Sequence, residues 1–405
     1  MKFNRPSQLL LVSIVGLFAA TLLTACQIVT IDYLFVATAG LSGSGAGQIE
    51  TYAVDSSSGA IRTIAPAVSS GGATPVSMVV TSDYANLYVA NQGNTSVAHF
   101  SIADSGVLTA KDSVNVGFVP ASIAVNSTGT FLYVTGGTNP SELAVYPLSS
   151  GTIGSQAALV SLTLSAVSST FSADLLVPTG VTVLENGSAV YVSLYDRSAN
   201  NPGGSTTSTA NPGWVFGFTS GSGGALTATA GSPYRAGVRA SAVTADPTNR
   251  FLYVTDFASN DLIGYTIQST GALSAMLNGP FKTGNEPVAL TVEPRGLYIY
   301  VVDALQNSLT SYSIVLATGA ASATSGSVGG GNPTDTQPVA VVVGPALGRY
   351  VYTANFLGNS ISGFKLDPDS GGLTPTQASP YVTGQNPSAL AAVPHGNHAI
   401  QVVTP

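Results

Sequence analysis

Charge is scarce in this sequence, and cysteine is almost absent. The 405 residues include 12 Lys and Arg and 19 Asp and Glu, so that 8% are charged, whereas 44% are hydrophobic. Such low charge excludes a disordered polyelectrolyte and a charged coiled coil. The basic residues form no run and the net charge is −7, which excludes a nucleic-acid partner. The chain is therefore expected to bury a large core.

The single cysteine, Cys26, excludes a disulfide framework and a metal site built from several thiolates. It follows two cations, Lys2 and Arg5, and an apolar run over residues 9–23. A helix of that length spans about 22 Å, which is short of a bilayer core. The arrangement is typical of a secretory signal peptide.

The segment Leu23-Thr24-Ala25-Cys26 resembles a bacterial lipobox. This resemblance implies that residues 1–25 are removed as a signal peptide and that Cys26 carries a lipid. Residues 27–405 are then expected to form a single domain tethered to a membrane of the cell envelope. Because Gln27 follows the cysteine, the resemblance favours the outer membrane or the cell surface.

A helical period is also missing, because no stretch after the signal repeats its apolar residues every 3.6 positions. Instead, a three-residue pattern with an aromatic centre recurs about every fifty residues. Seven copies are clear: Leu34-Phe35-Val36, Leu87-Tyr88-Val89, Leu132-Tyr133-Val134, Val190-Tyr191-Val192, Leu252-Tyr253-Val254, Ile299-Tyr300-Val301 and Val351-Tyr352-Thr353. An eighth, Ile400-Gln401-Val402, is weak. Such a period suits a four-stranded propeller blade.

Each repeat has the same internal order. The aromatic strand is followed by a polar turn, an alternating strand, a Gly-containing hairpin, a variable strand and then a Pro that begins a strand of small residues. The chain starts within a repeat, at Ile31 to Thr38, and supplies the missing first strand at Pro387 to Val393. We therefore predict an all-β fold, a seven-bladed β-propeller closed by pairing of N- and C-terminal strands. The segment Ala399 to Val403 either pairs at that seam or is a partial duplication.

These residues resemble the lactonase-like seven-bladed propellers related to 6-phosphogluconolactonase, with their Tyr-Val-Thr-Asn-type repeats. The resemblance is carried by Tyr253-Val254-Thr255-Asp256, Tyr88-Val89-Ala90-Asn91, Tyr352-Thr353-Ala354-Asn355, the run Asp246 to Tyr253 and the turn Gly231-Ser232-Pro233-Tyr234. It implies a hydrolase of sugar lactones. The chain departs from the enzymes where they have a His-Pro-His segment, since it reads Val177-Pro178-Thr179-Gly180, and Tyr195-Asp196-Arg197 retains only an Asp-Arg pair.

The face where second strands end and first strands begin is the expected working face, because two long loops, Asp196 to Gly213 and Ser155 to Val177, extend from it. Its basic loop residues are expected to hold a carboxylate, a phosphate or a sugar acid. The ligand-binding candidates are Arg235, Arg239, Lys282, Asn91, Asp256, Asp303 and Asn355. The catalytic candidates are Asp196, Arg197 and Glu286. The alternative for this set is solvated loop charge and capped turns.

Other residues are expected to be structural. Three arginines, Arg250, Arg295 and Arg349, precede aromatic strands on the opposite face, and Trp214 is expected to anchor packing. A structural or surface role is also expected for the three histidines, His99, His395 and His398. The Asp367 to Gly372 segment lacks the closing Glu of a calcium loop and is expected to be a hairpin.

Two functions follow from the sequence. The first is an exported, lipid-anchored binding module for a glycan, a cell-wall component or a protein. The alternative is a lactone hydrolase in which Arg197, Arg235 or Arg239 holds the acid and Asp196 or Glu286 is the general base. Neither needs a cofactor or a metal, and a monomer is expected.

Overall fold

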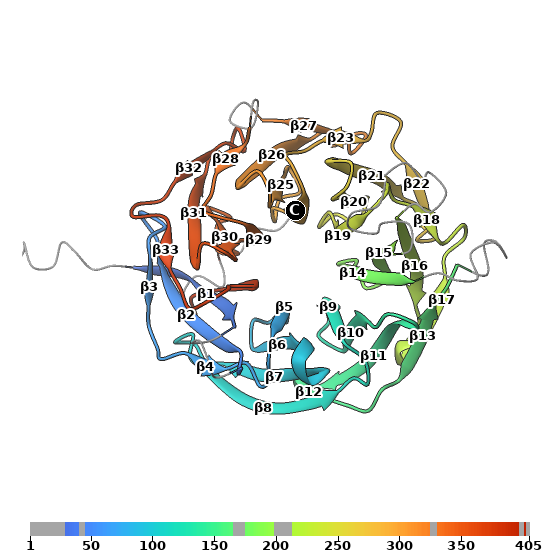
Figure 1. The fold of residues 1–405 in the computed structure, drawn as a ribbon, viewed down its shortest axis with the longest axis horizontal. Helices are drawn as coiled ribbons and strands as arrows, with labels where there is room; N and C mark the ends of the chain where they lie inside the picture. The colour runs from blue at the N-terminus through green and yellow to red at the C-terminus, as the bar shows by residue number, and fades with distance from the viewer. Residues whose placement is uncertain are drawn as a thin grey trace, which may run out of the picture.

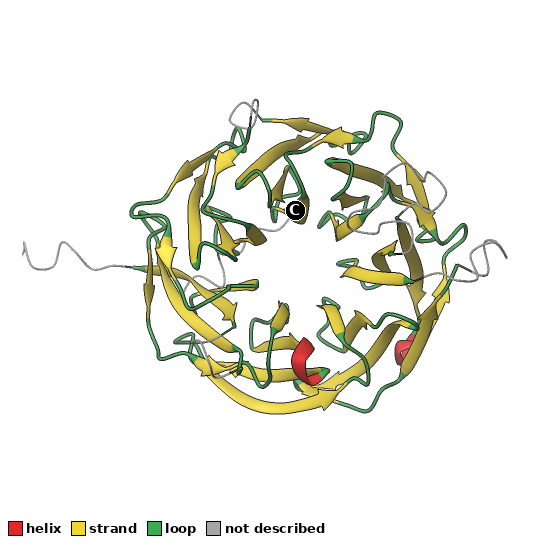
Figure 2. Ribbon diagram, viewed as in Figure 1, coloured by secondary structure: helices red, strands yellow, loops and turns green. Residues whose placement is uncertain are grey.

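The computed structural model describes residues 29–39, 45–164, 175–197, 213–324, 330–396 and 401. The predicted signal peptide and Cys26 therefore lie outside the described residues, as do His398, most of the 399–403 segment and residues 198–212 of the Asp196 to Gly213 loop. Of the predicted Ser155 to Val177 loop only residues 165–174 lie outside, and the remainder contains strand β13 (Ala158–Leu162) and the start of β14 (Leu176–Val183), so this loop is shorter than predicted. Strands make up nearly all of the regular secondary structure of the described residues and are joined by loops and turns (Figure 2). Two short 3₁₀ helices, η1 (Gln92–Asn94) and η3 (Ser222–Gly224), are the exceptions.

Seven sheets are arranged in a ring around a central axis (Figure 1). We number these blades I to VII by the order of their second strands. The innermost strands of blades I to VII are β34 (Ala389–Pro394), β5 (Pro75–Val80), β9 (Pro120–Val125), β14 (Leu176–Val183), β19 (Ala240–Ala245), β24 (Pro287–Val292) and β29 (Pro338–Val343). The second strands are β1 (Thr30–Thr38), β6 (Asn86–Asn91), β10 (Phe131–Gly136), β15 (Ala189–Asp196), β20 (Phe251–Asp256), β25 (Tyr298–Asp303) and β30 (Tyr350–Asn355).

The third strands are β2 (Gln48–Asp55), β7 (Ser96–Ile102), β11 (Ser141–Ser149), β16 (Trp214–Ser220), β21 (Asp261–Ile267), β26 (Ser308–Ile314) and β31 (Ser360–Leu366). The outer strand is continuous only in blade II, as β8 (Leu108–Asn115). Elsewhere it is split into β3 (Ile61–Thr63) and β4 (Val68–Ser69), β12 (Thr152–Ile153) and β13 (Ala158–Leu162), β17 (Leu226–Ala228) and β18 (Tyr234–Arg235), β22 (Leu273–Ala275) and β23 (Phe281–Lys282), β27 (Ala321–Ala323) and β28 (Asn332–Pro333), and β32 (Leu373–Pro375) and β33 (Tyr381–Val382). The four-stranded blades predicted from the sequence are thus present, with an interrupted fourth strand in six of them.

The ring closes as predicted. The C-terminal strand β34 pairs antiparallel with β1, with Asp32 opposite Pro394 and Ala37 opposite Ala389. Blade I therefore contains one strand from the end of the chain and the others from its beginning. Closure leaves no free sheet edge between the first and last repeats.

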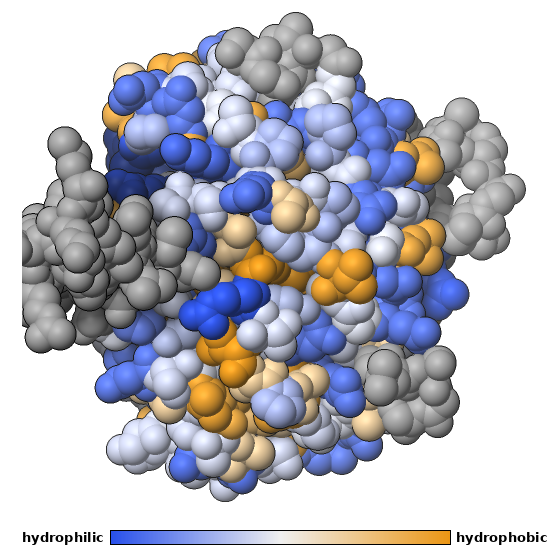
Figure 3. Space-filling view, turned by 90° about the vertical axis from the view of Figure 1, so that its left-hand side faces the viewer, coloured by the Kyte–Doolittle hydropathy of each residue, from blue (hydrophilic) through white to orange (hydrophobic). Residues whose placement is uncertain are grey.

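The core is divided among the blades. Among the described residues, seven separate hydrophobic clusters form, one between each pair of neighbouring blades. The repeated aromatic residue lies in these layers, as Tyr253 does between blades V and VI. The side of the molecule that carries blades I and VII is mainly hydrophilic, with small hydrophobic groups scattered over it (Figure 3). No helix among the described residues is long and apolar enough to cross a membrane.

The tyrosines of the repeat also join the blades through hydrogen bonds. Five of the six hydroxyls donate to a backbone carbonyl in a glycine hairpin of the next blade, whereas the hydroxyl of Tyr133 is paired with that of Ser220 (2.8 Å). The pairs are Tyr88–Gly151, Tyr191–Gly271, Tyr253–Gly319, Tyr300–Gly371 and Tyr352–Gly59. The repeated tyrosine therefore marks the second strand of a blade and also forms a contact between neighbouring blades.

Candidate functional site

The loop face, where second strands end and innermost strands begin, carries an arginine held between two aromatic rings. The guanidinium carbon of Arg239 lies 4.9 Å from the ring centroid of Tyr195 and 4.3 Å from that of Phe257. Tyr195 comes from the end of β15 in blade IV, whereas Phe257 directly follows β20 in blade V. Stacking of this kind fixes a guanidinium while leaving its N–H edge available for a carboxylate or an oxyanion.

The backbone before β19 is held by Asp256. Its buried carboxylate accepts hydrogen bonds from the amides of Val238 (2.8 Å), Arg239 (2.9 Å) and Ala258 (3.1 Å). Gly237 has a φ of +66°, and a side chain there would collide with this carboxylate. Asp256 was predicted to bind a ligand, and the structure places it beneath the loop that presents Arg239.

Hydroxyl groups join neighbouring innermost strands around the central axis. The Thr179 hydroxyl donates to the carbonyl of Ala240 (3.1 Å), and the Ser241 hydroxyl donates to that of Pro287 (2.6 Å). The strands β14, β19 and β24 are thereby fixed side by side. Arg239 and Glu286, which immediately precede β19 and β24, therefore lie at neighbouring positions around the axis, on the loop face.

The remaining candidates of blades IV and VI differ in their burial and in their partners. Asp196 is buried at the end of β15, and Arg197 next to it is exposed. Arg235 is exposed in β18, with its guanidinium carbon 5.4 Å from the ring centroid of Trp214. Trp214 is itself buried in the core between blades III and IV, as predicted. Glu286 is only half-buried and has a φ of +57°, with its amide bound to the side chain of Asn260 (2.8 Å).

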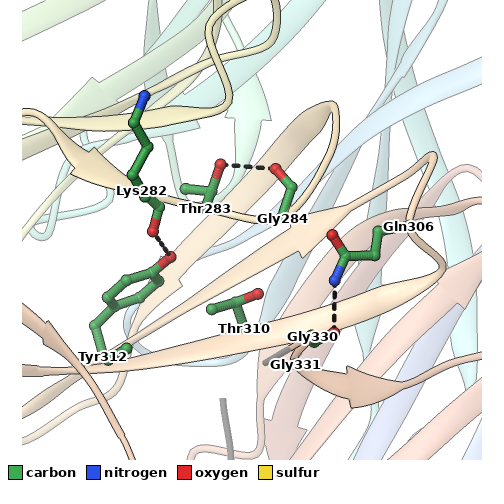
Figure 4. Close-up of a pocket in the computed structure, with 9 residues that line it drawn as sticks. Lys282, Thr283, Gly284, Gln306, Thr310, Tyr312, Gly330 and Gly331 are labelled. Atoms are coloured by element: carbon green, nitrogen blue, oxygen red, sulfur yellow. Dashed lines mark hydrogen bonds between the residues drawn. The ribbon is translucent and has the colours of Figure 1, made fainter. Parts of the chain in front are cut away.

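Lys282 and Asp303 belong to a different part of the loop face. Lys282 lines a pocket of about 340 Å³ on blade VI together with Thr283, Gln306, Thr310, Tyr312 and Gly331 (Figure 4). The Nζ atom of Lys282 lies 2.7 Å from a carboxylate oxygen of Asp261. Asp303 is fully buried and accepts hydrogen bonds from Thr310 and Ser308. Burial raises the pKa of Asp303 to about 7.

Asn91 and Asn355 are buried at the ends of their strands, where they complete turns. The Asn91 side chain bonds both the hydroxyl (2.7 Å) and the carbonyl (2.9 Å) of Ser70. The Asn355 amide donates to the hydroxyls of Ser360 and Ser362, each at 3.0 Å. The structure therefore places Arg239 with Asp256 beneath it, and Glu286, at the starts of β19 and β24, and it places Asp196 and Arg197 at the end of β15, which also carries Tyr195. Arg235 lies on the outer strand of blade IV, and the other candidates lie elsewhere on the face.

Residues expected to be structural have partners within the protein. His99 is buried between Asp112 (2.6 Å) and Asn86 (2.9 Å). On the opposite face Arg250 donates to the carbonyl of Leu316, and Arg295 donates to that of Pro368. The Asp367 to Gly372 segment is a hairpin, in which the Asp367 amide donates to the Gly372 carbonyl (2.9 Å). Within the described ranges no group of three His, Cys, Asp or Glu side chains is placed to bind a metal.

Sequence reasoning missed both rings that hold Arg239. The sequence pattern marks Tyr195 only as part of an Asp-Arg motif, and it gives Phe257 no predicted role. The aromatic residue directly after Asp256 was the available signal, because it projects from the same face as the candidate arginines.

The fold and the family model agree. The family of seven-bladed β-propeller lactonases matches residues 46–165 and 239–402. The chain therefore belongs to this lactonase family of β-propellers. A search of curated proteins finds no matching relative.

Solved structures show the same architecture. The periplasmic gluconolactonase of Pseudomonas aeruginosa superposes with a TM-score of 0.71 at 20% identity, covering 90% of this chain and 99% of that one. A Bacteroides uniformis protein, provisionally described as a 6-phosphogluconolactonase, gives a TM-score of 0.70 at 17% identity, covering 91% and 100%. A protein from Lactobacillus plantarum gives 0.68 at 14% identity, covering 90% and 100%. At these identities the likeness concerns the fold.

Proposed function

We propose that this protein hydrolyses a sugar lactone to the corresponding sugar acid on the loop face, where blades IV, V and VI meet near the central axis. The observation that carries the proposal is the fixed position of Arg239, stacked between Tyr195 and Phe257 and adjacent along the ring to Glu286. Membership of a lactonase family supports the same chemistry.

The reaction adds water to the lactone carbonyl carbon and breaks the ring ester bond. Arg239 stabilises the negative charge that develops on the carbonyl oxygen, which is the task of a preorganised donor in acyl transfer. Glu286 takes the proton from the attacking water and returns it to the departing ring oxygen. Asp196 is fully buried whereas Glu286 is half-buried, so Glu286 is the better placed of the two predicted bases. Arg197 and Arg235, both exposed, attract the acid or phosphate group of a charged substrate.

The test is a pH-stat assay of the purified protein with glucono-δ-lactone and its 6-phosphate, measured against the spontaneous rate. We expect Arg239→Met to lower kcat/KM by about 10²–10³-fold, as loss of one oxyanion donor does. The matched control is Arg349→Met, because Arg349 is an exposed arginine on the opposite face. Wild-type turnover no faster than the spontaneous reaction, or equal turnover in both variants, would contradict the proposal.

The competing proposal is a non-catalytic binding module, which the sequence favours through Val177-Pro178-Thr179-Gly180, where a histidine pair is missing. Its ligand would be a glycan, a sugar acid or a protein held by the same loop face. An inactive protein that still binds gluconate in an Arg239-dependent manner would favour this module over the hydrolase.

We also propose that the chain is exported and held in the cell envelope by a lipid on Cys26, as a monomer. The support is the segment Leu23-Thr24-Ala25-Cys26 after a short apolar run. Labelling with an alkyne fatty acid in a bacterial host should mark the wild type and leave Cys26→Ala unmarked. Equal labelling of both chains, or of neither, would contradict the lipid anchor.

A further inference from the structure

A pocket at the boundary between blades V and VI, called the blade VI pocket here because most of its lining residues belong to blade VI, is lined by other residues than those of the proposed hydrolase site and has a different chemistry. It is bounded by β23, β26, β27 and the turns that precede β24 and β28. Its volume of about 340 Å³ is at the small end of ligand pockets. Figure 4 shows polar side chains converging on it from three sides.

The hydroxyl hydrogens around this pocket are already used within the protein. The Tyr312 hydroxyl donates to the carbonyl of Lys282 (2.6 Å), and the Thr283 hydroxyl donates to that of Gly284 (2.9 Å). The Thr310 hydroxyl donates to the carboxylate of Asp303, which lies fully buried behind the pocket. Each of these oxygens therefore keeps lone pairs, and not a hydrogen, for a ligand.

The amide of Gln306 is committed in a similar way. Its nitrogen donates to the carbonyl of Gly330 (2.7 Å), and its oxygen accepts from the amide of Asn285 (3.1 Å). The oxygen retains a second lone pair, so it is a further acceptor at the pocket wall. The carbonyl groups of Lys282, Gly284 and Gly330 add to the same acceptor surface.

An anionic ligand does not suit this surface. Lys282 is the one cation among the described residues that line the pocket, and its Nζ atom is paired with Asp261 at 2.7 Å. A carboxylate or phosphate would face a wall of lone pairs with the Asp303 carboxylate behind it. A ligand rich in hydroxyl donors satisfies the same wall without introducing charge.

We infer that the blade VI pocket is a binding site for a neutral saccharide of one or two sugar rings, separate from the hydrolase site. Sugar hydroxyls donate to the oxygens of Thr283, Thr310 and Tyr312, and Thr310 is oriented for this by Asp303 behind it. The pocket gives the protein a second contact with carbohydrate, on the same face as the proposed catalytic residues.

The experiment uses calorimetric titration and saturation-transfer NMR of the whole protein at pH 8, where Asp303 is ionised. The neutral probes are glucose, galactose, mannose, N-acetylglucosamine, cellobiose and chitobiose, and the charged probes are gluconate and glucose 6-phosphate. We expect at least one neutral sugar to bind, and its affinity to be independent of Arg239→Met. Because Arg197 and Arg235 are the residues proposed to attract the acid or phosphate group of a charged substrate, binding of the charged probes should be weakened in the Arg197→Met/Arg235→Met double variant and unchanged in Ala323→Trp.

Two variants and one control test whether the neutral sugar binds in the blade VI pocket. Ala323→Trp fills the pocket and should abolish neutral-sugar binding, whereas Ala275→Trp is the matched control in blade V. Ala323 is paired with Tyr312 and Ala275 with Tyr265, at the same position of an outer strand, and both are exposed. Thr310→Val removes one acceptor and should weaken binding by about fivefold.

The inference is overturned if no neutral probe binds at any attainable concentration, or if Ala323→Trp and Ala275→Trp bind equally. Lactone turnover is measured on the same proteins, and Ala323→Trp should keep the wild-type rate. If the wild-type protein binds a neutral sugar but does not hydrolyse the lactone, the proposed hydrolase function is contradicted and the inferred blade VI binding site is supported.

Discussion

The hydroxyl of Tyr352 in blade VII donates a hydrogen bond to the carbonyl of Gly59 in blade I, across 2.7 Å and across the seam of the ring. Beside it, Tyr350 donates to the carbonyl of Ser56 (3.0 Å). The two residues of each pair are almost 300 positions apart in the chain. The seam thus has the same tyrosine-to-hairpin link as four other blade boundaries, in addition to the β34–β1 pairing.

Replacing Tyr352 with Phe should lower the free energy of unfolding by about 1–2 kcal/mol, because the buried Gly59 carbonyl loses its partner while the ring is retained. Phe fits at this position of a blade, since Phe35 occupies it in blade I. Urea unfolding measures the change. The control is Tyr381→Phe, whose hydroxyl bonds an exposed carbonyl near the outer edge, and it should cost less. Equal costs would show that the seam bond has no special weight.

The hairpin glycines that receive these bonds are required for a second reason. Gly371 has a φ of +69°, and a Cβ atom there would overlap the ring of Tyr298. Gly223 has a similar φ of +71°, but a Cβ atom there would have no other atom within 4 Å. Both Gly→Ala changes cost about 1 kcal/mol for the left-handed conformation. Gly371→Ala should cost about 1–3 kcal/mol more because of the overlap. The two variants are compared by thermal unfolding. An equal loss of stability in both would show that the close packing of Gly371 against Tyr298 does not require glycine.

Much of the fold could be predicted because each element of the repeat is marked by residues that lie close together in the sequence. The aromatic strands, the Gly hairpins and the Pro before each inner strand can each be recognised within a few residues. The Pro387 to Val393 segment has the pattern of an innermost strand, which predicted that it closes the ring by pairing with the N-terminal strand. The division of the outer strand into two short strands could not be predicted, because a strand such as Phe281–Lys282 has too few residues to show an alternating pattern.

The candidate site was less predictable because its contacts cross blades. Tyr195, Arg239 and Phe257 come into contact only when two blades pack together, and their spacing in the sequence does not predict this contact. Likewise, Lys282 and Asp303 stood out as charges in a charge-poor chain, whereas Thr310 and Tyr312 looked like ordinary strand residues. The sequence showed which face carries charge, and packing decided which residues became neighbours and which were buried.

Truncation tests the closure directly. Removing residues 387–405 deletes β34, leaves the inner side of β1 unpaired and exposes the clusters on both sides of blade I. We expect the shortened protein to lose its cooperative unfolding transition, followed by circular dichroism. Removal of residues 402–405 alone spares β34 and should keep the transition. A full transition after the longer deletion would contradict the closure argument.

Buried Asp32 should make stability depend on pH. Its carboxylate accepts a hydrogen bond from the Ala346 amide (3.0 Å), and burial raises its pKa from 3.8 to about 8. Between those values the native state holds a proton that the unfolded chain has released. The free energy of unfolding should therefore fall as the pH rises through this window, by up to about 1.4 kcal/mol per pH unit for one group.

Asp303 contributes a similar fall, but only up to about pH 7, where its native pKa lies. Asp32, with the higher native pKa, therefore contributes the larger part of the fall between pH 7 and 8. Asp32→Asn keeps an oxygen for the Ala346 amide and cannot titrate, so its stability should be flatter over that interval in urea unfolding. Asp367→Asn is the control, because hydrogen bonds from the Asp369 amide and Ser370 lower the pKa of exposed Asp367, so its effect is confined to acid pH. If Asp32→Asn keeps the wild-type slope, the fall arises from another group.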